Sequence, residues 1–212
     1  NVTEFLEQLK NDDALKSRTR LREVVVAVNL DQELNRKGAN RSNLLKMLND
    51  LAKQATDIQA KQLAQNFIKT STQFEKGSPA YHFKLKDGAG DKISLESLKG
   101  KPAALIFAAG WSRESLNQLK LVNDLYVKFG KDINFVLVDL DDNEDDMEYL
   151  ITGTQTQIPT KVSYSADKYM IEAMNILYVP QIVLIDRAGN YFRHNAKDPM
   201  HGLEAELTEL IR

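Results

Sequence analysis

Three short apolar runs constrain the fold of this chain more than any other feature of its sequence. They are KPAALIFAA at 101–109, INFVLVDL at 133–140 and PQIVLID at 180–186, and apolar and polar residues hardly alternate in them. Such runs are typical of central strands whose two faces are both covered. Helical patterns separate the runs, and a short strand, YFRHN, and a closing helix, GLEAELTELI, follow them. We therefore expect an α/β fold with a mixed sheet flanked by helices.

The first part of the chain has a different pattern. Residues 1–76 lack the buried-strand runs and repeat apolar residues mostly at helical steps, so we expect a mostly helical N-terminal region before a domain of residues 77–212. The β-branched run from Val24 to Leu30 leaves a strand open as an alternative to a helix. Ser42 or Asn43 is the predicted cap of one long amphipathic helix that extends to about Ile68.

Composition excludes several classes of protein. Charged residues make up 27% of the 212 residues and the net charge is −2, whereas a nucleic-acid binder normally carries a basic stripe. No run reaches the roughly 18 apolar residues that a transmembrane helix needs, and the opening NVTEFLEQLK resembles a trimmed start. The chain has no cysteine, which excludes disulfides, thiolate metal sites and thiol catalysis in the chain as given. We expect no cofactor and no metal site.

The stretch GWSRES at 110–115 joins the first buried strand to a helix. Ser112 stands at the start of that helix, where its hydroxyl is expected to accept a hydrogen bond from the backbone N–H of Ser115 as an N-cap. Anion or thiolate binding at the helix N-terminus is the alternative role. A hydrolase nucleophile is disfavoured, because GWSRE lacks the second glycine of the G-x-S-x-G turn. In addition, no acidic residue is matched to His82, His194 or His201.

The acidic run DLDDNEDDMEYL at 139–150 invites comparison with a calcium loop. It has no glycine at the position where an EF-hand loop requires one. We therefore expect a solvated loop that leads from a strand to a helix with acidic caps.

The order of elements and the local motifs resemble the thioredoxin superfamily, in particular its TlpA-like group of extracytoplasmic thiol–disulfide proteins. The resemblance covers residues 77–212 and rests on three stretches whose order and spacing match those of the family. They are GSPAYHFKLKDGAGDKISLESLKGK, LIFAAGWSRES and ILYVPQIVLIDRAGNY. The N-terminal region is loosely similar to the segment that precedes this domain in envelope proteins of Bacteroidetes-type bacteria.

In this family the turn is Trp-Cys-x-x-Cys. The resemblance implies that Ser112 holds the position of the nucleophilic cysteine and Ser115 that of the resolving cysteine. It also implies that Val179 and Pro180 match the residue and the cis-proline that face the motif. Disulfide exchange requires a thiolate, so the serines predict a redox-inactive domain. Ile106 occupies the position where relatives often carry a buried acidic residue.

Three functional hypotheses stay open at this point. The leading one is a redox-inactive TlpA-like module of the periplasm or cell envelope that binds a protein or an extended peptide, without nucleic acid. Its groove would comprise Trp111, Ser112, Val179 and Pro180. The second is a genuine thiol–disulfide oxidoreductase seen as a Cys-to-Ser variant, because the sequence does not separate natural from engineered serines. The third is a structural or assembly module whose N-terminal helices make the functional contact or a homo-oligomer.

Overall fold

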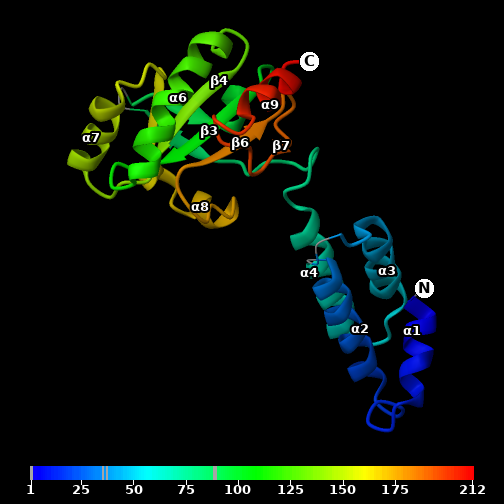
Figure 1. Cartoon of the computed structure of the whole chain (residues 1–212). Helices are drawn as coiled ribbons and strands as arrows, with labels where there is room; N and C mark the ends of the chain where they lie inside the picture. Colours follow the sequence, from blue (N-terminus) through cyan, green and yellow to red (C-terminus); the bar gives the residue numbers. More distant parts are fainter. Residues whose placement is uncertain (1, 35, 37, 88–89) are drawn as a thin grey trace. The chain divides into compact units, whose positions relative to one another are not determined.

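The computed structural model describes residues 2–212 except 35, 37 and 88–89. The chain divides into two compact units, Asn1–Gln73 and Phe74–Arg212 (Figure 1). The sequence DGAGD at 87–91 is typical of a turn, but its residues 88–89 lie outside the described residues. Among the residues that are described, no helix is long and apolar enough to cross a membrane.

The first unit is helical. Its elements are α1 (Val2–Gln8), η1 (Leu9–Asn11), α2 (Thr19–Leu34), α3 (Arg41–Gln54) and α4 (Ile58–Thr72). The strand alternative for Val24–Leu30 is wrong, because the run lies inside α2 and buries Val26, Leu30 and Leu34 at steps of four residues. These side chains pack against residues of α1, α3 and α4 in one core. The apolar stripe of this region therefore packs on itself.

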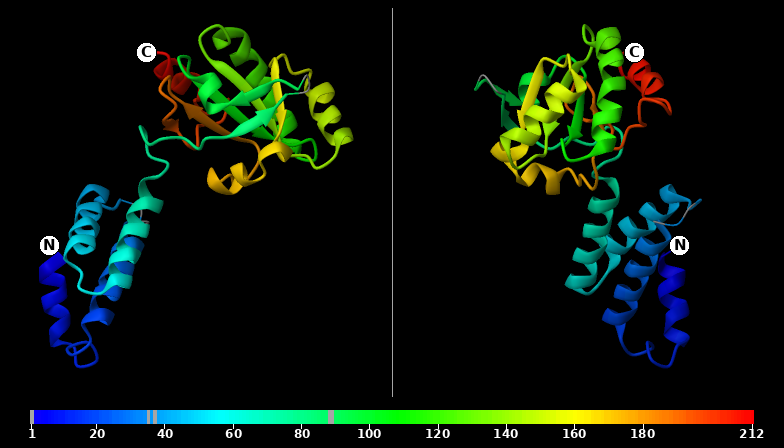
Figure 2. Two further views of the ribbon diagram at one scale, coloured as in Figure 1. Left: turned by 180° about the vertical axis from the view of Figure 1, so that it is seen from behind. Right: turned by 60° about the vertical axis from the view of Figure 1, so that its left-hand side comes forward.

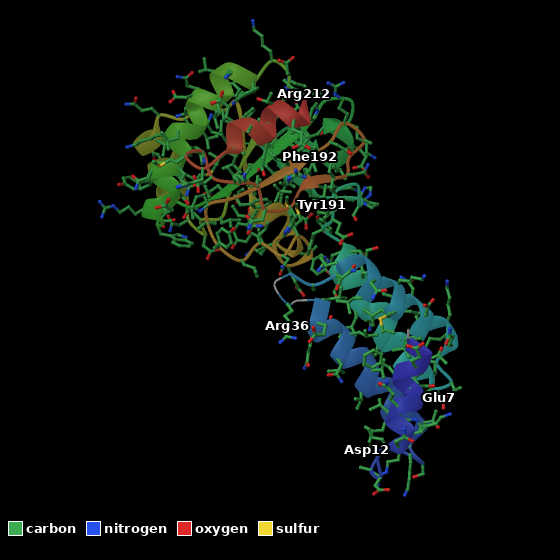
Figure 3. All side chains as sticks on the ribbon, turned by 45° about the vertical axis from the view of Figure 1, so that its right-hand side comes forward. Glu7, Asp12, Arg36, Tyr191, Phe192 and Arg212 are labelled. Atoms are coloured by element: carbon green, nitrogen blue, oxygen red, sulfur yellow. The ribbon has the colours of Figure 1, made fainter. Side chains whose placement is uncertain are left out.

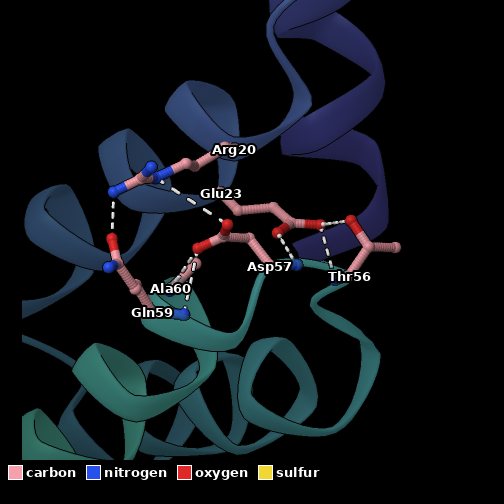
Figure 4. Close-up of polar contacts among 6 residues, drawn as sticks. All are labelled: Arg20, Glu23, Thr56, Asp57, Gln59 and Ala60. Atoms are coloured by element: carbon pink, nitrogen blue, oxygen red, sulfur yellow. Dashed lines mark hydrogen bonds and ion pairs between the residues drawn. The ribbon is translucent and has the colours of Figure 1, made fainter.

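The single long helix predicted to extend to Ile68 is two helices, and the buried carboxylate of Glu23 explains the break (Figure 4). Glu23 accepts hydrogen bonds from the backbone N–H groups of Thr56 (2.8 Å) and Asp57 (2.9 Å) and from the Thr56 hydroxyl (2.9 Å). Asp57 then caps α4. The cap of α3 is Asn40, not Ser42 or Asn43; its side chain accepts from the N–H of Asn43.

The second unit contains a five-stranded mixed sheet, which confirms the predicted fold class. The strand order is β5-β4-β3-β6-β7, with β3 parallel to β4, β4 parallel to β5, and β6 antiparallel to both β3 and β7. The strands are β3 (Ala103–Ala108), β4 (Asn134–Asp139), β5 (Thr160–Ser163), β6 (Gln181–Ile185) and β7 (Tyr191–Arg193). A separate hairpin pairs β1 (Lys84–Lys86) with β2 (Lys92–Ser94).

Both faces of the sheet are covered, as the apolar runs predict (Figure 2). Helices α6 (Arg113–Phe129), α7 (Glu144–Thr154) and α9 (Leu203–Leu210) contribute to the core on one face. The β1–β2 hairpin, α5 (Leu95–Leu98) and α8 (Tyr169–Ala173) contribute to the core on the other. Successive residues of a strand point to opposite faces, so Tyr191 and Phe192, labelled in Figure 3, belong to different cores.

The helical pattern of ADKYMIEAMNILY, residues 166–178, which precedes the run at 180–186, forms a much shorter helix than its length indicates. A 3-10 turn, η2 (Tyr164–Asp167), precedes α8, and α8 ends at Ala173. Asn175, two residues later, has a φ of 47°, a left-handed conformation that asparagine adopts more readily than most residues. Ile176–Pro180 then form an irregular segment that leads into β6.

Candidate functional site

The GWSRES turn lies between the end of β3 at Ala108 and the start of α6 at Arg113. Ser112 is the N-cap of α6, as predicted, and its Oγ accepts a hydrogen bond from the N–H of Ser115 at 3.1 Å. Ser115 is fully buried, and its Oγ accepts from the N–H of Ala109 at 3.3 Å. Both hydroxyl oxygens therefore satisfy backbone N–H groups of the turn that carries them.

The structure brings the turn next to the Val179–Pro180 segment. The peptide bond between Val179 and Pro180 is cis. The Oγ of Ser112 lies 3.5 Å from the carbonyl oxygen of Val179. Trp111 projects outward from the same turn and is 68% exposed. Pro180 also lines a cavity of about 210 Å³ whose wall includes Gln118, Tyr178 and Asn195.

The backbone before Pro180 is available for pairing. Among the described residues, the N–H groups of Tyr178 and Val179 have no hydrogen-bond acceptor, and these two residues belong to no strand. The neighbouring Leu177 and Tyr178 side chains are exposed, at 75% and 51%. A segment outside any strand, with free N–H groups and flanking exposed side chains, has features of an edge to which another strand can be added.

Ile106 of β3 is buried in the core. A pair of buried acids, Asp139 and Asp141, lies beside the turn, and the sequence interpretation missed it. Asp141 accepts a hydrogen bond from the N–H of Gly110 at 2.6 Å through Oδ2, and Asp139 lies beside it. Burial and the neighbouring Asp141 raise the pKa of Asp139 to about 8. The acidic run is thus not simply a solvated loop, although Asn143 caps α7 after it.

None of the three histidines contacts Ser112 within the described part of the chain. His82 pairs with Glu96, His201 pairs with Asp198, and the Nε2 atom of His194 contacts the carbonyl oxygen of Met174. Burial lowers the pKa of His194. No histidine of the described residues is therefore in contact with Ser112 to act as its general base, although His82 and His201 each have an acidic partner that the spacing did not indicate. Over the described residues, no group of three or more histidine, aspartate or glutamate side chains is arranged to hold a metal ion.

The sheet order, the helix that follows β3, and the approach of the Ser112 turn to Val179–Pro180 define a thioredoxin-like domain. A family model described as thioredoxin-like matches residues 100–191. The thiol-disulfide oxidoreductase ResA of Bacillus anthracis is 28% identical over 150 residues, 69% of this chain and 86% of ResA. ResA of Bacillus cereus ATCC 10987 is 24% identical over 128 residues, 60% of this chain and 73% of ResA.

Solved structures agree with this assignment. The crystal structure of a candidate thiol-disulfide oxidoreductase from Bacteroides vulgatus covers 66% of this chain and 99% of its own, with a TM-score of 0.59 and 25% identity. The unit of residues 74–212 therefore has a thioredoxin-like fold, and its sequence is similar to that of thiol-disulfide oxidoreductases such as ResA. This chain differs from an active dithiol enzyme in having no cysteine.

Proposed function

We propose that the thioredoxin-like domain is a redox-inactive member of the TlpA-like group that binds an extended peptide or protein segment in the cell envelope. The groove comprises Trp111, Ser112, Val179 and Pro180. The observation that supports this proposal is that the backbone N–H groups of Tyr178 and Val179, in the segment next to the Ser112 turn, have no acceptor among the described residues. Strand addition there uses main-chain hydrogen bonds and needs no thiol. The helical unit of residues 1–73 is a separate domain in this proposal.

The first prediction tests the groove. A phage-displayed library of random peptides is selected on the wild-type chain, and a selected peptide is synthesised and labelled for fluorescence anisotropy. We expect Val179→Asp to weaken binding of this peptide at least about tenfold. The reason is that a charge replaces a half-buried apolar side chain next to the backbone that would pair with the peptide. Trp111→Ala removes the exposed ring and should weaken binding as well.

Val127→Asp is the matched control, since it introduces the same change at a valine of α6 that is 68% exposed and outside the groove. This variant should bind like the wild type. If folded Val179→Asp binds with unchanged affinity, the proposed groove is wrong and the helical unit becomes the place to look for a binding surface.

A second candidate function is thiol–disulfide exchange in a natural protein whose residues 112 and 115 are cysteines. Its support is the homology to thiol-disulfide oxidoreductases and the retained position of Ser112 at the start of α6. A thiol at a helix N-terminus has a lowered pKa, which favours the reactive thiolate. Sequencing the natural gene at codons 112 and 115 distinguishes the two functions directly.

The second prediction concerns the restored motif. We expect the Ser112→Cys, Ser115→Cys double variant to acquire insulin-reducing activity in the presence of dithiothreitol, while the wild type stays at the uncatalysed rate. The physical reason is that two thiols complete the exchange cycle in a turn that otherwise keeps its geometry. Ser115→Cys alone is the control, because a single buried thiol cannot complete the cycle. A folded double variant without activity would show that further parts of the catalytic site are missing.

A further inference from the structure

Asp139 and Asp141 form a buried acidic pair where β4 ends. Asp139 is 2% exposed and Asp141 is 4% exposed, and Asp139 lies in register with Ala108 of β3 and Ser163 of β5. The carboxyl groups of the pair are within hydrogen-bonding reach of each other. Two ionised carboxylates at such a buried position repel each other and lose their hydration, so this placement requires a compensating feature.

The hydrogen bonds of the pair leave one oxygen of each carboxyl group without a donor. Asp141 accepts the N–H of Gly110 at 2.6 Å through Oδ2, and Asp139 accepts the N–H of Asp141 at 3.3 Å through Oδ1. The remaining atoms, Asp139 Oδ2 and Asp141 Oδ1, are buried and have no hydrogen-bond partner among the described residues. A proton held by one of the two carboxyl groups would turn an acceptor oxygen into a donor, which is the kind of group that this buried pair lacks.

We propose that Asp139 and Asp141 share one proton, held by Asp139 and donated to Asp141, and that this acid pair is a pH-sensitive latch on the Gly110–Trp111 turn. The charged member is Asp141, because its short hydrogen bond from the Gly110 N–H favours a carboxylate. Loss of the shared proton places two charges in one buried site, and repulsion then displaces the side chain that holds Gly110. The inference does not depend on whether the groove binds a peptide.

The surroundings of the pair favour retention of the proton. Asp146 of α7 adds negative charge nearby and, like burial and Asp141, raises the pKa of Asp139.

The other elements around the pair contribute further polar groups. The loop contributes Asp142, whose carboxylate accepts a hydrogen bond from the hydroxyl of Tyr164. From the β5–η2 side, Ser163, Tyr164 and Lys168 line a cavity of about 300 Å³ together with the pair. Lys168 is the one basic residue among the described residues that line this cavity. The β3 side contributes the backbone N–H of Gly110.

The test uses the intrinsic fluorescence of the full chain, because Trp111 is its single tryptophan and directly follows Gly110. We expect wild-type emission to show a one-proton transition at weakly alkaline pH when the pH is varied from about 5.5 to about 9. Asp139→Asn should lose this transition, since the asparagine amide still donates to Asp141 but does not titrate. Asp142→Asn, the matched control at a neighbouring exposed acid, should keep it.

Three results would overturn the inference. One is a wild-type emission that stays constant over this range, and another is a transition that persists in Asp139→Asn. The third is a change in tryptophan emission when Mg²⁺ or Ca²⁺ alone is added at neutral pH, if Asp139→Asn abolishes that change. The unpaired oxygens would then be cation ligands.

If Asp139→Asn does not fold, infrared spectra of the wild type test the shared proton instead. A protonated carboxyl band that is present at about pH 6.5 and lost by about pH 9 supports the shared proton, and absence of the band at the lower pH refutes it.

Discussion

Gly110→Ala is expected to lower the free energy of unfolding of the thioredoxin-like domain by about 2.5–6 kcal/mol. A Cβ atom at this position would overlap the backbone carbonyl oxygen of Asp146 and would lie 3.2 Å from Oδ2 of Asp141. The first contact is to backbone at the start of α7 and is not relieved by a rotamer change. Overpacking of this kind costs about 1–3 kcal/mol, and loss of a buried hydrogen bond to a charged group adds about 1.5–3 kcal/mol.

Urea denaturation followed by far-ultraviolet circular dichroism measures this effect. The control is Gly153→Ala in α7, where the nearest atoms to the added methyl group would lie 3.8–3.9 Å away, at ordinary contact distance. Gly153→Ala should raise the free energy of unfolding by up to about 1 kcal/mol, because alanine has a higher helix propensity than glycine. An unchanged urea midpoint for Gly110→Ala would contradict the close approach of α7 to the motif turn.

Asp139→Asn is expected to remove a large pH dependence of stability between about pH 5 and pH 8. Burial raises the folded-state pKa of Asp139 from 3.8 to about 8, so the folded chain holds a proton that the unfolded chain releases. The stabilisation is complete below the unfolded-state pKa and is lost as the pH rises through about 8. The wild type should therefore lose stability on this interval, by at most about 1.4 kcal/mol per pH unit for one proton.

Denaturation midpoints of the wild type and Asp139→Asn at several pH values across this interval measure this difference. The comparison also cancels the opposite contribution of His194, whose lowered pKa favours the folded state as the pH rises. The difference in stability, variant minus wild type, should increase with pH. Parallel pH profiles would mean that Asp139 is ionised in the folded protein throughout the interval.

The sheet could be predicted from the sequence because its central strands are buried on both faces. That burial leaves a direct trace in runs such as 101–109 and 133–140. The start of α6 could also be predicted from the sequence, since a capping serine accepts a hydrogen bond from an N–H only three residues away. The break between α3 and α4 could not be predicted, because it depends on Glu23, which is 33 residues before Thr56 in the chain.

The buried acid pair shows a second limit of the sequence. Asp139 and Asp141 stand in a run of acidic residues whose composition indicates exposure to solvent. Their burial follows from tertiary contacts: β5 pairs with β4, and the N–H of Gly110 comes from the end of β3. The spacing offered one weak signal, because Asp139 directly continues the apolar strand run VLV.

The serine hydroxyls of the motif have a consequence for regulation. A dithiol turn exists in two covalent forms, and a protein that carries it can respond to the redox potential of its compartment. The turn of this chain exists in a single covalent form, closed by the hydrogen bonds of Ser112 and Ser115 to backbone N–H groups. In the chain as given, this turn therefore has no thiol through which a change in redox potential could alter its covalent structure.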